Sequence, residues 1–149
     1  MARGAGFIEY GENGKGVHSR WYPQTLKRRI TEIAHVRSRI EFVHGDAFEV
    51  IEKYSDCEGA VFFIDPPYTA SKKKAGSRLY NHFDVDHARL FREAATVRGE
   101  VLLTYDNAEE ILELAAAVGM QTRAISMKNN HHAEMTELLI GKDLSWVSS

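Results

Sequence analysis

An unbroken apolar run that ends in a carboxylate and two prolines is the feature that most constrains the fold of this chain. The run is AVFFIDPPYT, residues 60–69. Five apolar residues in succession indicate a strand covered on both faces, as in a parallel sheet. Pro66 and Pro67 have no backbone N–H and cannot extend a ladder of hydrogen bonds. The strand is therefore expected to end at Asp65.

The end of this strand is also the first candidate for a functional site. In open α/β sheets, ligands bind outside the carboxyl ends of the strands. Because Asp65 precedes a proline, its backbone is held in the extended region and the strand geometry continues to the carboxylate. The carbonyl groups here remain acceptors, and Tyr68 adds a flat ring, so the cluster suits an amino group on a planar ring. The alternative is a strand that ends in a proline turn, with Asp65 capping a nearby group.

Helix and strand patterns alternate along the rest of the chain. Helices are predicted from Pro23 onward, over residues 46–54, over 85–97 and over 108–118. Strands are predicted over RIEFVHG (39–45), GAVFFID (59–65), EVLLTYD (100–106), QTRAISMK (121–128) and EMTELLIG (134–141), the last two as an antiparallel pair around the polar segment NNHHA. This alternation predicts a parallel α/β sheet closed by an antiparallel strand pair. We expect one domain over residues 1–149, with an irregular lead-in over 1–22 and the α/β core over 23–149.

Local signals support these helices. Asp46 is placed to cap the helix that follows it, and Gly119 is placed to end the helix before it. Apolar residues recur at helical spacing in two of the predicted helices. They are Leu26, Ile30, Ile33 and Ala34 in the first, and Leu90, Phe91, Ala94 and Ala95, predicted to face inward, in the third.

Charge and cysteine content set broad limits on partners and location. The net charge is −2, but residues 41–70 are acidic whereas SKKKAGSR (71–78) is strongly basic. A polyanion partner would suit this pattern, but solvated helix faces explain the same counts and are favoured on charge alone. Cys57 is the only cysteine, which rules out an internal disulfide and fits a reducing compartment. Without a signal peptide or a membrane-length apolar run, we expect a soluble cytoplasmic protein with no membrane partner.

The signature DPPY at the end of an apolar strand resembles that of amino-directed, S-adenosylmethionine-dependent methyltransferases, above all the N6-adenine DNA methyltransferases. The chain is similar to the C-terminal half of the Dam-type group over about residues 10–147. The similar segments, in the same order, are SRWYPQTLKRRI, IEFVHGDAFEVI, YNHFDVDHARLF, VLLTYDN and MTELLIG. The resemblance implies a Rossmann-like sheet, S-adenosylmethionine as the methyl donor and double-stranded DNA as a partner.

The resemblance also implies the catalytic residues, which are Asp65, Pro66, Pro67 and Tyr68. The Asp65 carboxylate and the Pro66 carbonyl would each accept one N–H of the adenine amino group, so that its nitrogen attacks the sulfonium methyl directly. The base would leave the duplex and stack on Tyr68. Cofactor binding is implied for Asp46, Phe48 and Asp65, with Asp46 at the adenine end and Phe48 as an apolar wall. The alternative is that Asp46 only caps the following helix.

A mobile basic loop that folds over DNA follows the signature in this family. The implied DNA-binding residues are Arg20, Lys72, Lys73, Lys74, Arg78 and Tyr80, with phosphate contacts from the basic residues of the loop. Tyr80 and Phe83 line the base pocket or anchor the loop, and a solvated loop is the alternative. Arg20 and Trp21 would form a DNA-facing strip with Lys27, Arg28 and Arg29, although a solvated helix face explains the last three as well. His131 and His132 lack a supporting Cys or carboxylate set, so they indicate a polar turn and not a metal site.

One element of the family is missing. Nothing upstream of Asp65 supplies the Gly-rich strand-to-helix turn that holds the methionine end of the cofactor, and the first two strands are absent with it. Either RIEFVHG and GAVFFID pair directly, or an exposed edge remains. We therefore expect a truncated fragment, a split enzyme whose N-terminal half is a separate chain, or a degenerate relative without cofactor binding.

Three functions stay open on the sequence. The first is a DNA adenine N6-methyltransferase, or the C-terminal half of one. The second is a non-catalytic nucleic-acid-binding remnant of such an enzyme. An RNA amino-methyltransferase is the third, and the segments WYPQTL and ELLIG disfavour it.

Overall fold

The computed structural model describes residues 22–67, 85–128 and 134–147. The elements are α1 (Pro23–Val36), the 3-10 helix η3 (Arg37–Arg39), α2 (Ala47–Tyr54), β1 (Val61–Ile64), α4 (His87–Thr96), β2 (Glu100–Asp106), α5 (Glu109–Ala117), β3 (Gln121–Lys128) and β4 (Glu134–Gly141). The described part of the chain is an α/β fold with one mixed, open four-stranded sheet and four α-helices. By its internal contacts the chain divides into two units, residues 1–45 and 46–149. No described helix has the length and apolar character needed to cross a bilayer.

The first unit contains α1, which confirms the helix predicted from Pro23. The proline occupies the first turn, where a missing N–H costs nothing. None of the residues of α1 is buried, and Ile30 and Ile33 of its apolar stripe are 65% and 57% exposed.

The strand predicted over RIEFVHG is wrong. Arg37–Arg39 form a 3-10 turn, and the segment that follows, up to Gly45, has no regular structure. Ile40 has an extended backbone, yet Phe42 is 86% exposed. A strand is stabilised by its ladder with a neighbour, and no described strand pairs with this segment.

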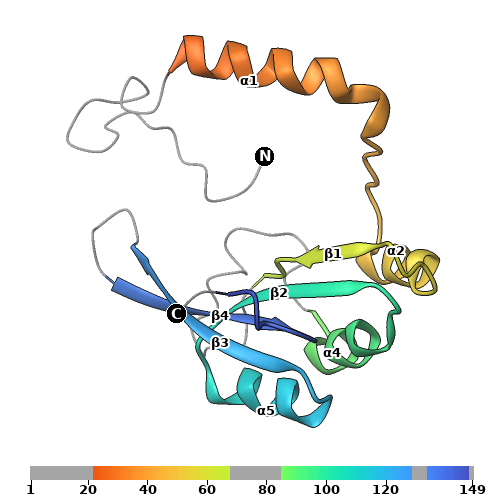
Figure 1. Cartoon of the computed structure of the whole chain (residues 1–149), viewed down its shortest axis with the longest axis vertical. Helices are drawn as coiled ribbons and strands as arrows, with labels where there is room; N and C mark the ends of the chain where they lie inside the picture. Colours follow the sequence, from red (N-terminus) through yellow and green to blue (C-terminus); the bar gives the residue numbers. More distant parts are fainter. Residues whose placement is uncertain (1–21, 68–84, 129–133, 148–149) are drawn as a thin grey trace. The chain divides into compact units, whose positions relative to one another are not determined.

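The second unit is built on a sheet with the strand order β1-β2-β4-β3 (Figure 1). β1 and β2 are parallel, whereas β4 runs antiparallel to both β2 and β3. The predicted antiparallel pair of β3 and β4 is confirmed. The predicted parallel sheet holds only for β1 and β2, because its expected first strand does not form.

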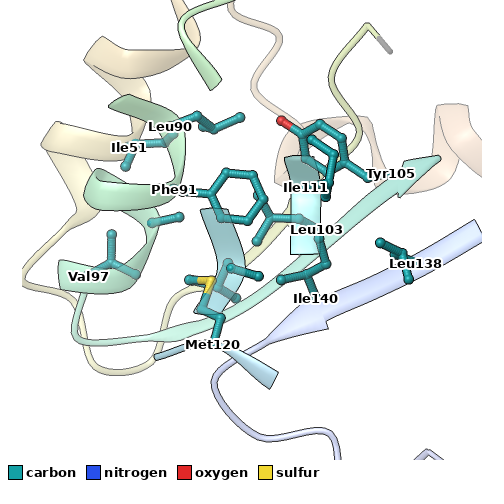
Figure 2. Packing of buried hydrophobic residues seen from close by; sticks show 13 residues of the cluster. Ile51, Leu90, Phe91, Val97, Leu103, Tyr105, Ile111, Met120, Leu138 and Ile140 are labelled. Carbon is teal, nitrogen blue, oxygen red and sulfur yellow. The ribbon is translucent and has the colours of Figure 1, made fainter. Parts of the chain in front are cut away.

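One face of the sheet carries the hydrophobic core. α4 and α5 lie on the same side of the sheet (Figure 1), where Phe91 and Ile111 are fully buried. Figure 2 shows the cluster, with Leu90 and Phe91 on one side and residues of β4 on the other. The buried positions Val101, Leu103 and Tyr105 alternate along β2, as expected of a strand with one packed face.

No described element of the second unit covers the opposite face of the sheet, so the expectation that β1 is covered on both faces is wrong. Val61 and Phe63 on this face are 76% and 65% exposed, whereas Phe62 and Ile64 pack against the core. Among the described strands β1 pairs with β2 alone. Of the two alternatives predicted for β1, an exposed edge is the one found. Alternate residues of the apolar run therefore differ in burial: Phe62 and Ile64 pack on the core, whereas Val61 and Phe63 are exposed.

The three helices of the second unit confirm their predictions, with ends shifted by one or two residues. Asp46 caps α2 by accepting a hydrogen bond from the Phe48 backbone N–H at 3.0 Å. Asp86 caps α4 in the same way, so the helix begins at His87 and not at Val85. After α5 the chain turns through Gly119, whose φ of +73° favours glycine.

Candidate functional site

The carboxyl end of β1 is the centre of the candidate site. Ile64 is the last residue of the strand, and Asp65, Pro66 and Pro67 follow without regular structure, which confirms that the sheet ladder stops at the prolines. Asp65 is exposed and the two prolines are half-buried. The carboxylate is therefore at the surface, at the end of a strand that packs Phe62 and Ile64 against the core. Tyr68 lies outside the described residues.

Thr104 of β2 contacts this carboxylate. Its hydroxyl donates a hydrogen bond to Asp65 Oδ1 at 2.7 Å. The register explains the meeting, because Ile64 stands beside Leu103 and the next residues of the two parallel strands follow side by side. Thr104 shares the uncovered face with Phe63, so its contact with Asp65 lies on that face.

Tyr105, the next residue of β2, points to the core face. It is fully buried, and its hydroxyl lies 2.8 Å from Nδ1 of His87. The two rings meet edge to face, with centroids 5.6 Å apart. Since His87 is the first residue of α4, this contact ties the start of that helix to the carboxyl end of β2.

The last residue of β2 adds a second carboxylate at the same edge of the sheet. Asp106 Oδ1 is buried, and it has no hydrogen-bond partner among the described residues. Arg123 Nη1 on β3 is the other described side-chain atom in this condition. Because β1 and β2 are parallel, Asp65, just after β1, and Asp106, the last residue of β2, lie at the carboxyl ends of neighbouring strands. Two acceptors at one edge suit a ligand with N–H donors.

Asp46 and Phe48 lie at the start of α2, and their contacts are with that helix and with α4. The Asp46 side chain caps α2, so the structural alternative to a cofactor role is present. The Arg89 guanidinium lies over the Phe48 ring, 4.0 Å from its centroid. Its hydrogen bond to Glu93 at 2.5 Å raises the pKa of Arg89, and the carboxylates of Asp46 and Asp86 act in the same direction. Cofactor binding by Asp46 and Phe48 stays a prediction.

A hollow of about 310 Å³ lies between α2 and α4. Its lining residues are Ile51, Glu52, Ser55, Arg89, Glu93, Thr96 and Val97. Neither Asp46 nor Asp65 lines it. Two of its lining residues, Arg89 and Glu93, form an ion pair along α4. The hollow is therefore separate from the chemistry predicted at the end of β1.

Most of the predicted nucleic-acid-binding residues lie outside the described residues. They are Arg20, Trp21, Lys72, Lys73, Lys74, Arg78, Tyr80 and Phe83. The described ones, Lys27, Arg28 and Arg29 on α1, are all exposed, and Arg28 lies 3.9 Å from Glu32. This solvated helix face agrees with the alternative reading of these three residues. His131 and His132 also lie outside the described residues.

Sequence reasoning missed Thr104, Tyr105 and His87. A signal for Thr104 was present, because aligning the ends of GAVFFID and EVLLTYD as parallel neighbours places Thr104 beside Asp65. No local signal marks the contact between Tyr105 and His87, which depends on how α4 packs on the sheet.

The carboxyl ends of β1 and β2 thus place the exposed Asp65 carboxylate, bonded to the Thr104 hydroxyl, at the same edge of the sheet as the Asp106 carboxylate. Such a group of acceptors can hold an amino group and stabilise positive charge that develops on it. No protein-family model matches this chain, and no curated protein matches it.

Proposed function

We propose that this chain is the catalytic part of a DNA adenine N6-methyltransferase that uses S-adenosylmethionine. The observation that carries the proposal is Asp65, an exposed carboxylate at the carboxyl end of β1 that accepts a hydrogen bond from Thr104 and is followed by two prolines. The resemblance of DPPY and the ordered segments to the Dam-type family supplies the substrate and the donor.

In this proposal Asp65 and the Pro66 carbonyl accept the two N–H bonds of the adenine amino group. The lone pair of that nitrogen is delocalised into the ring, and two acceptors placed on its hydrogens make the nitrogen more pyramidal and nucleophilic. The carboxylate also stabilises the positive charge that develops during transfer. Tyr68 would hold the flipped base by stacking, which is worth about 1–3 kcal/mol per base.

S-adenosylmethionine, when bound, supplies the methyl group. Asp46 and Phe48 are the residues that would hold its adenine end. They fit this role in part, since Asp46 is exposed but its Oδ1 caps α2, and the Phe48 ring is half-buried beneath Arg89. Their part is to bind and orient, so no chemical step is assigned to them.

We further propose that a separate chain supplies the N-terminal half of the enzyme. One side of β1 pairs with no described strand, and this supports the arrangement, because an edge strand offers N–H and C=O groups to a further strand. The exposed Val61 and Phe63 offer apolar surface to whatever accompanies that strand. The same chain would also bring the Gly-rich turn that this sequence lacks.

The test is methyl incorporation into double-stranded DNA, with and without an added N-terminal half of a Dam-type enzyme. The wild-type chain is expected to transfer methyl groups at least in the presence of the second half. Asp65→Ala is expected to lower the rate by at least roughly 10²–10³. The folding midpoint should stay unchanged, because the side chain is exposed. Asp56→Ala, at another exposed aspartate, is the matched control and should retain the rate.

Three other outcomes would contradict this proposal or favour another function. Wild-type turnover by Asp65→Ala would sink the proposed mechanism. DNA binding by the wild-type chain without transfer in either condition would favour the nucleic-acid-binding remnant. Methylation of RNA in preference to DNA would favour the third function.

A further inference from the structure

We propose that Thr104 is a positioning residue, whose hydroxyl sets the direction in which the Asp65 carboxylate accepts the substrate amino group. The inference rests on the proposed function of Asp65 and adds a residue to it. The contact that carries it is the hydrogen bond from Thr104 Oγ1 to Asp65 Oδ1, at 2.7 Å. Bonds that involve an ionised acceptor are shorter and roughly twice as strong as neutral ones.

The Thr104 hydroxyl is held in place by the sheet. β2 is paired on both sides, with β1 and with β4, and Thr104 stands opposite Leu139 of β4. Its branched Cβ leaves few rotamers available. Backbone and side chain are therefore both fixed before any ligand arrives.

Asp65 lies outside the sheet ladder. It follows the last residue of β1 and is exposed, and each contact that its side chain makes narrows the set of staggered rotamers open to it. A carboxylate has about four lone-pair sites, so accepting the Thr104 hydroxyl leaves capacity for a substrate N–H. The hydroxyl thus selects the orientation of the carboxylate and leaves lone pairs that can accept a hydrogen bond from the substrate.

The location of the Thr104–Asp65 hydrogen bond indicates that its main contribution is not to folding stability. Both partners lie on the uncovered face of the sheet, and the hydrogen bond is solvent-exposed. An exposed hydrogen bond adds little to folding, whereas a misplacement of about 1 Å at a reacting group can lower a rate 10²-fold. The contact therefore matters most for orientation.

The experiment compares Thr104→Val, which removes the hydroxyl at nearly constant shape, with Thr104→Ser, which keeps it. Thr122→Val on β3 is the matched control, since Thr122 is an exposed threonine on an edge strand of the same sheet. Methyl transfer into DNA is measured with the chain assembled as in the test above. The carbon-13 resonance of the Asp65 carboxyl group is recorded for each variant without substrate.

Thr104→Val is expected to lower kcat roughly 10- to 100-fold, with KM for DNA and for S-adenosylmethionine changed less than about threefold. It should also move the Asp65 carboxyl resonance. Thr104→Ser should return both quantities close to wild type, and Thr122→Val should change neither. Rescue by serine and the split between kcat and KM are results that a merely structural role would not give.

Several outcomes would overturn the inference. If the wild-type chain transfers methyl groups and Thr104→Val does so at the same kcat, Thr104 has no positioning role and the proposed function stands. If the carbon-13 resonance of the Asp65 carboxyl group is the same in Thr104→Val as in the wild type, the contact does not orient the carboxylate. If Asp65→Ala retains wild-type activity, the proposed mechanism fails, and the role of Thr104 fails with it.

Discussion

Consecutive residues at the end of β2 serve opposite faces of the sheet. Thr104 donates to Asp65 on the uncovered face, and Tyr105 reaches His87 on the core face. Side chains alternate along a strand, so a single strand end can support both the candidate site and the packing of α4. The buried hydroxyl of Tyr105 should therefore affect stability and leave the Asp65 site unchanged.

Tyr105→Phe removes that hydroxyl at nearly constant volume. We expect the free energy of unfolding to fall by about 1 kcal/mol, the typical net contribution of one hydrogen bond. Urea unfolding followed by circular dichroism measures the change. Tyr54→Phe is the control, since Tyr54 is 39% exposed, and it should stay within about 0.5 kcal/mol of wild type. Equal effects in the two variants would show that the bond to His87 contributes nothing.

At the level of elements, the start of β2 depends on a close approach between Gly99, the residue before β2, and Ala60, the residue before β1. A Cβ at this position would lie 2.2 Å from the Ala60 carbonyl oxygen, whereas a Cβ at Gly59 would meet nothing within 4 Å. The Ala60 carbonyl also accepts the Glu100 N–H at 3.0 Å, next to the first register pair of the two strands. The close approach thus helps to fix the register that brings Thr104 beside Asp65.

Gly99→Ala is expected to destabilise the fold by about 1–3 kcal/mol, because backbone must move to admit the methyl group. The matched variant Gly59→Ala should change the free energy of unfolding by less than about 0.5 kcal/mol. Chemical denaturation of both variants tests the difference. A Gly99→Ala protein as stable as Gly59→Ala would mean that the two strands can shift at no cost.

The elements that sequence predicted correctly are those with local signals. α2 and α4 have aspartate caps next to an apolar stripe, and the turn after α5 has Gly119. The failures concern pairing between distant segments. RIEFVHG has the composition of a strand, but a strand exists only with a neighbour, and a single sequence does not state whether that neighbour is present. The exposed face of β1 went unpredicted for the same reason.

In the candidate site, too, the residues with local sequence signals were predicted and those that depend on distant contacts were missed. Asp65 and the prolines were predicted because strand, carboxylate and ladder breaker are adjacent in the chain. Capping of α2 by Asp46 was foreseen as an alternative because it spans two residues. Thr104 and His87 were missed because each acts across a distance of 18 or more residues. Register and packing, not composition, bring them to their partners.

For the molecule as a whole, the exposed apolar side chains of β1, Val61 and Phe63, form a surface with consequences for solubility. An apolar edge strand is a template for pairing with another chain. Phe63→Lys is expected to lower self-association at high protein concentration and to leave stability nearly unchanged, since the ring is 65% exposed. Sedimentation velocity measures the association. Phe42→Lys makes the same change at an 86% exposed ring in the first unit and should have no such effect. Equal effects of the two changes would locate the association elsewhere.

The place of β4 in the sheet has a consequence for synthesis. β4 follows β3 in the chain, yet it lies between β2 and β3 and pairs with both. As the chain leaves the ribosome, β1 and β2 can pair early, but β3 emerges with no partner until β4 has been made. The sheet is therefore completed only in a late step, and a nascent chain released before β4 would carry the β1–β2 pair and a β3 that cannot join it.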